Sequence, residues 1–269
     1  MKTEVIVNQK GGVGKSAIAV QQAYYLAESM RVIVIDFDHQ GNATTPLREG
    51  DIATVSATPA SHLLTRPGAT VEAERFVIVP ADADELRQLE RFADREVNGG
   101  KQGDAYASNL QAFLRSVDAD FDVCIIDVNP TPDIRMISAL VTADYVLSPI
   151  QLNQEAINGI GTMLNHKHIG IRRIQQMLNP GLELIGVLPN LVEPTPFQRQ
   201  NFAAIATHYA SLLIPNGEGF CSIRRTTAIP EAQSAGVPIW KLGKTSSRDA
   251  WRDIKPVFDI IATRMGLTT

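Results

Sequence analysis

The sequence is poor in cysteine, nearly balanced in charge and free of long apolar runs, and each shortage excludes a class of protein. Cys124 and Cys221 are the only cysteines among 269 residues, which excludes a disulfide framework and a CxxC metal site. The 25 basic and 29 acidic side chains give a net charge of −4, so any nucleic-acid contact must come from a local patch. No run reaches the roughly 18 apolar residues of a membrane span.

The composition and the first residues indicate a soluble globular protein. Hydrophobic residues make up 44% of the chain and charged residues 20%, which excludes a mostly disordered chain. The first apolar run, residues 5–7, is too short for the core of a signal peptide. Because two cysteines also fit a reducing compartment, we expect a cytoplasmic protein. The length and the lack of a clear linker predict a single domain over residues 1–269.

Short apolar runs alternate with helix-length segments along the whole chain. The runs predict strands at residues 5–7, 31–36, 76–82, 122–127, 144–150 and 182–190. They are continuously apolar rather than alternating, which is typical of strands in a sheet that is covered on both faces. Strands separated by helices predict right-handed crossovers. The fold class is therefore α/β, a doubly wound and mostly parallel sheet with helices on both faces.

Four segments between or beyond these strands have local signals of their own. Residues 15–28 predict a helix without breakers, and residues 43–75 predict a short helix with loops. Residues 96–106 contain three glycines and predict an exposed loop. Residues 247–265 predict a last helix with a break or kink at Pro256.

The strongest motif follows the first strand, where NQKGGVGKS at residues 8–16 leads into a helix. Glycines let the backbone bend around a phosphate chain with its N–H groups inward, and the helix N-terminus adds partial positive charge. Lys15 can reach the β- and γ-phosphates, and the Ser16 hydroxyl can bind Mg²⁺. The strict phosphate-loop pattern has glycine six positions before the lysine, but this chain has Gln9 there.

This departure, together with three further segments, resembles the ParA/MinD class of P-loop ATPases, which has a deviant Walker A loop. The matching segments are KGGVGKS (10–16), RVIVIDFDHQGNAT (31–44), FDVCIIDVNP (121–130) and IPEAQSAGVPIWKLGKTSSRDA (229–250). They cover nearly the whole chain in the family's order and are most similar to short plasmid ParA and chromosomal Soj proteins. The first strand begins almost at once, so we expect no N-terminal helix-turn-helix domain.

The resemblance implies an ATPase with ATP and Mg²⁺ as cofactors and with named catalytic residues. Lys10 would be the signature lysine that reaches across a dimer to the partner's nucleotide, and Asp38 would orient or polarise the attacking water. Asn190 ends the sixth predicted strand, where related ATPases often place an adenine-reading amide, although it could also be a plain turn residue. The remaining nucleotide contacts would come from Gly11, Gly12, Val13, Gly14, Lys15, Ser16 and Ala17.

Acidic residues at two predicted strand ends suit a magnesium site, because open α/β sheets bind ligands at the carboxyl ends of their strands. Asp127 would act in the second shell of Mg²⁺ through water, beside Ser16. Asp36 would support either the Mg²⁺ shell or the geometry of its loop. Two details depart from the family: His39 stands where proline is common, and residues 128–133 differ from its usual pattern.

A local concentration of cations near the C-terminus predicts DNA contacts in this otherwise acidic protein. Arg248 and Arg252 lie on one helical face with Lys255. Cations in such an arrangement suit contacts to the phosphate backbone without base reading. Family members bind DNA non-specifically through this general region. The predicted DNA-binding residues are Arg224, Arg225, Lys241, Lys244, Arg248 and Arg252.

The leading hypothesis is a DNA-partition ATPase of a plasmid or chromosome with weak intrinsic activity. ATP would be sandwiched in a homodimer that binds DNA and the nucleoid, and a centromere-bound ParB-like partner would stimulate hydrolysis and release. One alternative is a MinD-like membrane-surface ATPase, but the C-terminal segment has the pattern of a packed helix rather than a basic amphipathic one. Another is a ParA-like positioner of a non-DNA cargo. An iron–sulfur relative would need suitably placed cysteines.

Overall fold

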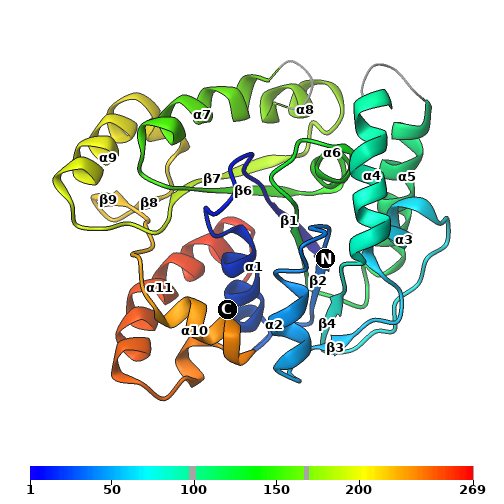
Figure 1. Cartoon of the computed structure of the whole chain (residues 1–269), viewed down its shortest axis with the longest axis horizontal. Coiled ribbons are helices and arrows are strands. Elements are labelled where there is room, and N and C mark those ends of the chain that lie inside the picture. The colour runs from blue at the N-terminus through cyan, green and yellow to red at the C-terminus, as the bar shows by residue number, and fades with distance from the viewer. Residues whose placement is uncertain (97–100, 167–169, 269) are drawn as a thin grey trace.

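The computed structural model describes residues 1–96, 101–166 and 170–268, and within these ranges one seven-stranded parallel sheet forms the centre of the molecule (Figure 1). The strand order is β3-β4-β2-β5-β1-β6-β7. The strands are β1 (Lys2–Ile6), β2 (Val32–Asp36), β3 (Thr54–Val55), β4 (Phe76–Val79), β5 (Val123–Asp127), β6 (Tyr145–Ile150) and β7 (Glu183–Pro189). The predicted doubly wound, parallel α/β class is confirmed.

Helices cover both faces of this sheet, as Figure 1 shows. One face is covered by α1 (Lys15–Leu26), α2 (Thr44–Glu49), α10 (Ala228–Ala235) and α11 (Thr245–Arg264). The other face is covered by α3 (Ala60–Thr65), α4 (Ala83–Glu96), α5 (Lys101–Ser116), α6 (Ile134–Thr142), α7 (Gln154–Asn165), α8 (Ile171–Met177) and α9 (Pro196–Tyr209). Short 3-10 helices at Ala210–Leu212 and Ile239–Lys241 and a hairpin of β8 (Pro215–Asn216) and β9 (Gly219–Phe220) complete the described elements.

The continuously apolar strands contribute side chains to two separate hydrophobic cores. Successive side chains of a strand point to opposite faces, so Val5 packs in the cluster under α3 to α9 and Ile6 in the cluster under α1, α10 and α11. The same alternation places Ile33 in the first cluster and Val34 in the second. An alternating sequence could fill only one of these cores, and this is why the apolar runs identified the central strands.

The order of the strands places a ligand crevice at the carboxyl end of β1. The chain crosses from β1 through α1 to β2 on one side and from β5 through α6 to β6 on the other. In open α/β sheets the crevice lies where such connections leave in opposite directions. The register adds two carboxylates to this edge, because Asp36 and Asp127 are paired neighbours at the ends of β2 and β5.

Several local predictions were wrong where long-range packing outweighed the local signal. Most of the expected loop at residues 96–106 is helix, since α4 ends at Glu96 and α5 begins at Lys101; residues 97–100 lie outside the described part. Residues 43–75 form two helices and the short edge strand β3. Helix α11 continues through Pro256 rather than breaking there, because its buried face packs against the sheet on both sides of the proline. None of the described helices is long and apolar enough to cross a bilayer.

One buried carboxyl group in β1 makes the stability of the fold depend on pH. Glu4 is fully buried and accepts a 2.6 Å hydrogen bond from the Gln22 side chain of α1. Burial raises the pKa of Glu4 to about 8, although the bond from Gln22 acts in the opposite direction. A raised folded-state pKa means that stability is fully present below the unfolded pKa and is lost as pH rises through about 8.

We therefore expect Glu4→Gln to stabilise the protein at about pH 9 far more than at about pH 5, by an amount on the order of a few kcal/mol. Glutamine keeps the shape of the side chain but cannot ionise. Urea unfolding of both proteins at the two pH values measures the difference. Glu183→Gln, at an exposed strand position, is the matched control and should show no such pH-dependent gain. An equal effect at both pH values would contradict the prediction.

Candidate functional site

The glycine-rich loop predicted to bind phosphate joins β1 to α1 at the carboxyl edge of the sheet. Gly12 has φ 73° and Gly14 has φ 88°, both in the left-handed region. A Cβ at Gly14 would also press against Nδ2 of Asn190, so any other residue there would have to displace that amide. Helix α1 begins at Lys15 with no side-chain cap, which leaves the N–H groups of its first turn available to an anion.

Amide side chains from neighbouring strand ends hold this loop in shape. Asn8 donates from Nδ2 to the Pro149 carbonyl at 2.8 Å, and its Oδ1 accepts from the Lys10 N–H at 2.7 Å. Gln151 donates to the Gly12 carbonyl at 2.8 Å. Sequence reasoning did not identify Asn8 and Gln151 as supports of the loop. The carbonyl that each of them binds belongs to a residue 141 or 139 positions away in the chain, and only the fold brings the two together.

Asn190 also supports the loop rather than standing apart as a turn residue. Its Nδ2 donates to the Val13 carbonyl at 2.8 Å, and the residue is buried. Its Oδ1 is buried and has no hydrogen-bond partner among the described residues. An amide with its donor side in use and its acceptor side open can still accept a hydrogen bond from a ligand.

An open cavity of about 450 Å³ brings the predicted phosphate loop together with Asp38. Sequence reasoning did not include four of its lining residues among the site residues. Gln40 and Asn42 belong to the DHQGN segment that was recognised, whereas Gln233 of α10 reaches the cavity only through the tertiary fold. The lining residues are Gly11, Gly12, Gly14, Lys15, Ser16, Ala17, Asp38, Gln40, Asn42, Pro130 and Gln233.

Lys15 is a buried cation at the floor of this cavity. It is 6% exposed, and burial lowers the pKa of its ammonium group, while the charges of Asp127 and Asp38 act in the opposite direction. A desolvated cation beside a glycine-rich loop is a strong electrostatic partner for an incoming anion. The contact between Lys15 and the β- and γ-phosphates stays a prediction.

Asp127 has the features of a carboxylate that serves a metal ion. It is fully buried, and neither of its oxygens has a hydrogen-bond partner within the described part of the chain. Burial raises its pKa well above the usual value, the charge of Asp36 adds to this, and the nearby Ser16 hydroxyl and Lys15 lower it. Unpartnered oxygens beside a hydroxyl form the hard, oxygen-rich donor set that Mg²⁺ prefers, so these residues fit the ion.

Asp36 is arranged differently from its neighbour Asp127, and its geometry supports the loop alternative. Its Oδ1 accepts from the Asp38 N–H at 3.0 Å, and its Oδ2 accepts from Ala43 N–H at 3.2 Å and from the Thr44 N–H and hydroxyl at 2.8 Å each. Burial raises the pKa of Asp36 to about 6, although these hydrogen bonds lower it. The carboxylate closes the loop that presents Asp38.

Lys10 does not line the phosphate cavity of its own chain. Its Nζ lies 2.5 Å from Glu155 Oε2 and 3.5 Å from Asn153 Oδ1, beside α7. It borders a separate cavity of about 280 Å³. The Lys10 ammonium lowers the pKa of the Glu155 carboxyl. A lysine directed away from its own loop must change partners before it can contact any phosphate.

The cations of the predicted DNA patch surround α11, but most are already paired. The ion pairs are Arg224 with Asp253 at 3.7 Å, Arg225 with Glu193 at 2.8 Å, Lys244 with Glu231 at 2.7 Å and Arg252 with Asp249 at 2.8 Å. Lys255, on the same face, binds Asp259 and lies over the Tyr25 ring. Within the described residues, Lys241 and Arg248 have no acidic partner and remain the free positive charges of this surface.

Sequence comparisons relate the chain to partition proteins. A family described as an AAA domain matches residues 1–184. Protein IncC of Escherichia coli is 33% identical over 279 residues, which cover 100% of this chain and 71% of IncC. The chromosome-partitioning ATPase Soj of Thermus thermophilus is 28% identical over 246 residues, which cover 90% of this chain and 88% of Soj.

Solved structures share the fold. The Cyanothece McdA–ATP complex has a TM-score of 0.76 at 23% identity and covers 100% of this chain and 98% of its own, which is evidence for the fold alone. Cobyrinic acid a,c-diamide synthase of Mycobacterium smegmatis, with bound ADP and magnesium, has a TM-score of 0.66 at 27% identity. That comparison covers 91% of this chain and 98% of the synthase.

Proposed function

Because the chain belongs to the ParA/MinD-type P-loop ATPases, a family that it shares with Protein IncC and the chromosome-partitioning ATPase Soj, we propose that it is a DNA-partition ATPase. The observation that carries this proposal is the cavity that joins the phosphate loop, Lys15 and Asp38. In that cavity ATP is the substrate and water is the second reactant. We propose weak intrinsic hydrolysis and control by nucleotide state.

Within the cavity each residue has a separate task. The backbone N–H groups of the loop and the Lys15 ammonium bind the β- and γ-phosphates, and Asp38 orients the attacking water. Ser16 and Asp127 would hold Mg²⁺, Asp127 through water, and the ion when bound neutralises phosphate charge. The Oδ1 of Asn190, which has no hydrogen-bond partner among the described residues, supports its proposed contact with adenine.

We place Lys10 in an ATP-sandwiched homodimer. In the single chain its ammonium is paired with Glu155 at 2.5 Å and is absent from the cavity lining. Glu155 is largely exposed, so this ion pair is weakly stabilising and can be exchanged for a better anion. A triphosphate in a partner subunit is such an anion, and a second cation there would stabilise the charge of the transferred phosphoryl group.

The DNA-binding and cellular parts of the proposal rest on the C-terminal cations and on the relatives. A dimer doubles the exposed positive surface, so DNA affinity should rise on ATP binding through avidity. The protein would then lie on the nucleoid in the cytoplasm, and a centromere-bound ParB-like partner would trigger hydrolysis and release. The similarity to the chromosome-partitioning ATPase Soj supports this role.

The membrane-surface alternative finds less support in the fold. The apolar side chains of α11 that such a mode would insert into lipid are packed in the core, among them Ile254, Phe258 and Ile261. A helix whose apolar face is already buried has no such face to offer to a bilayer. We therefore favour DNA as the surface on which the dimer assembles.

The DNA role is tested with the two unpaired cations. We expect Lys241→Glu combined with Arg248→Glu to weaken binding to a labelled duplex about tenfold or more and to reduce the salt dependence of binding. The measurement is fluorescence anisotropy with a non-hydrolysable ATP analogue at several salt concentrations. The matched control is Arg172→Glu with Arg173→Glu on α8, across the sheet, which makes the same charge change. Equal loss in both variants would contradict a specific DNA surface at α11.

A further inference from the structure

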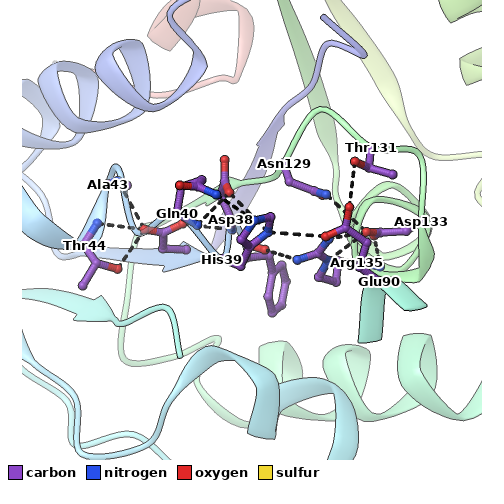
Figure 2. Close-up of polar contacts among 12 residues, drawn as sticks. Asp38, His39, Gln40, Ala43, Thr44, Glu90, Asn129, Thr131, Asp133 and Arg135 are labelled. Atoms are coloured by element: carbon purple, nitrogen blue, oxygen red, sulfur yellow. Dashed lines mark hydrogen bonds and ion pairs between the residues drawn. The ribbon is translucent and has the colours of Figure 1, made fainter. Parts of the chain in front are cut away.

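His39 lies between Asp38 and a cluster of charged residues that the nucleotide site does not explain (Figure 2). Its Nδ1 is 3.9 Å from Asp38 Oδ1 and 3.5 Å from Glu90 Oε2. The side chain is only 17% exposed, and Nδ1 is buried without a hydrogen bond to any described residue. A buried polar atom without a hydrogen bond destabilises the folded state, so its place beside two carboxylates calls for an explanation.

The neighbouring amide holds the other ring nitrogen. The Gln40 side-chain nitrogen lies 2.8 Å from His39 Nε2, which is hydrogen-bond distance. With Nε2 held in this way, Nδ1 is the ring nitrogen that faces the carboxylates of Asp38 and Glu90.

Of the two carboxylates that face His39, Glu90 of α4 is itself fixed in place. Its Oε2 lies 3.2 Å from the Arg135 guanidinium, and its Oε1 accepts from the Thr131 hydroxyl at 3.1 Å. Arg135 is fully buried, is paired with Asp133 through two nitrogens, and donates to the Phe37 carbonyl at 3.3 Å. A charge pair buried in this way cannot move without losing its partners.

The other carboxylate, Asp38, is held on one side only. Its Oδ1 accepts from the Gln40 N–H at 2.9 Å and faces His39. Its Oδ2 has no hydrogen-bond partner among the described residues, and the side chain borders the phosphate cavity. One oxygen is thus anchored by the protein while the other is open to water.

We propose that His39 is a positioning residue for Asp38: its ring, with Nδ1 3.9 Å from Asp38 Oδ1, packs beside this carboxylate and keeps it directed to the phosphate cavity. Glu90 faces the same ring nitrogen at 3.5 Å and is bound to Arg135, so the water-orienting carboxylate is supported by a chain of contacts that ends in α6. The inference rests on the proposed hydrolysis and adds a residue to it. His39 itself touches neither the nucleotide loop nor the reacting atoms.

The test separates turnover from nucleotide binding. His39→Ala should lower ATP turnover about tenfold and leave the ATP dissociation constant within about twofold, since a small misplacement of a catalytic group slows chemistry more than binding. His39→Asn should recover most of the rate, because its amide places a polar group at the position of Nδ1. His62→Ala is the matched control: His62 lies 3.7 Å from Glu85 of the same helix α4 but outside the site, and its loss should leave turnover unchanged.

A double-mutant cycle distinguishes positioning from a merely structural effect. In an Asp38→Asn background, where residual turnover is followed with radiolabelled ATP, His39→Ala should cause no further loss. Wild-type turnover in His39→Ala, or an equal loss in the Asp38→Asn background, would overturn the positioning role alone. A wild-type protein that does not hydrolyse ATP with DNA present would instead contradict the proposed function as well.

Discussion

Lys15→Ala should abolish ATP binding, with an affinity at least about a hundredfold below that of the wild type. The ammonium group is buried at the floor of the phosphate cavity, where little water replaces it. Without it the charges of Asp127 and Asp38 would face the triphosphate uncompensated. Equilibrium titration with a fluorescent ATP analogue measures the loss.

The second lysine of the same loop is the natural control for this variant. Lys10 is bound to Glu155 and does not line the cavity, so Lys10→Ala should keep the affinity of the single chain for ATP within about threefold. Circular dichroism confirms that both variants are folded. If Lys15→Ala bound the analogue as tightly as the wild type, the phosphate-loop assignment would be wrong.

Asp38→Ala should bind ATP and DNA but turn over about a hundredfold to a thousandfold more slowly. Asp38 is 5% exposed and borders the cavity. Its side chain accepts one bond within the loop, from the Gln40 N–H, whereas the bonds from Ala43 and Thr44 that close the loop go to Asp36. The variant therefore keeps the loop and loses the carboxylate that would orient water. Phosphate release measured under saturating ATP gives the rate.

A distant acidic substitution serves as the comparison. Asp84→Ala removes an exposed carboxylate in the first turn of α4, so its hydrolysis rate should match the wild type. ATP affinity of Asp38→Ala is measured in parallel, because weaker binding could also slow turnover. Hydrolysis by Asp38→Ala at the wild-type rate would remove Asp38 from the mechanism.

Much of the fold could be predicted because the amino-acid composition of a central strand indicates that it lies inside the sheet. A strand covered on both faces must be apolar at every residue, and β2 (VIVID) and β5 (VCIID) are recognisable for that reason. The phosphate loop could be predicted because a turn that places N–H groups inward requires glycine at fixed positions. Both signals are local, so a single segment of chain contains them.

Other elements were missed because their conformation depends on partners far along the chain. The glycines at residues 99–103 predict a loop, but Lys101–Ser116 is helical and packs in the core through Leu110 and Phe113. Pro256 predicts a break or kink, and of these the break is wrong, because the buried side chains on either side of it keep α11 continuous. The burial of an apolar face outweighs the cost of one lost backbone hydrogen bond.

The sequence by itself determined the parallel α/β class, the phosphate loop and the family, because periodic burial and glycine geometry are properties of short segments. Only the tertiary structure decided how the charged residues are used. Asp36 and Asp127 both end a strand. Asp36 closes a loop with four hydrogen bonds, whereas both oxygens of Asp127 are buried without a hydrogen-bond partner among the described residues. The links from Lys10 to Glu155 and from His39 to Glu90 follow from spatial neighbours, and the energy of a charge depends on those neighbours rather than on its position in the chain.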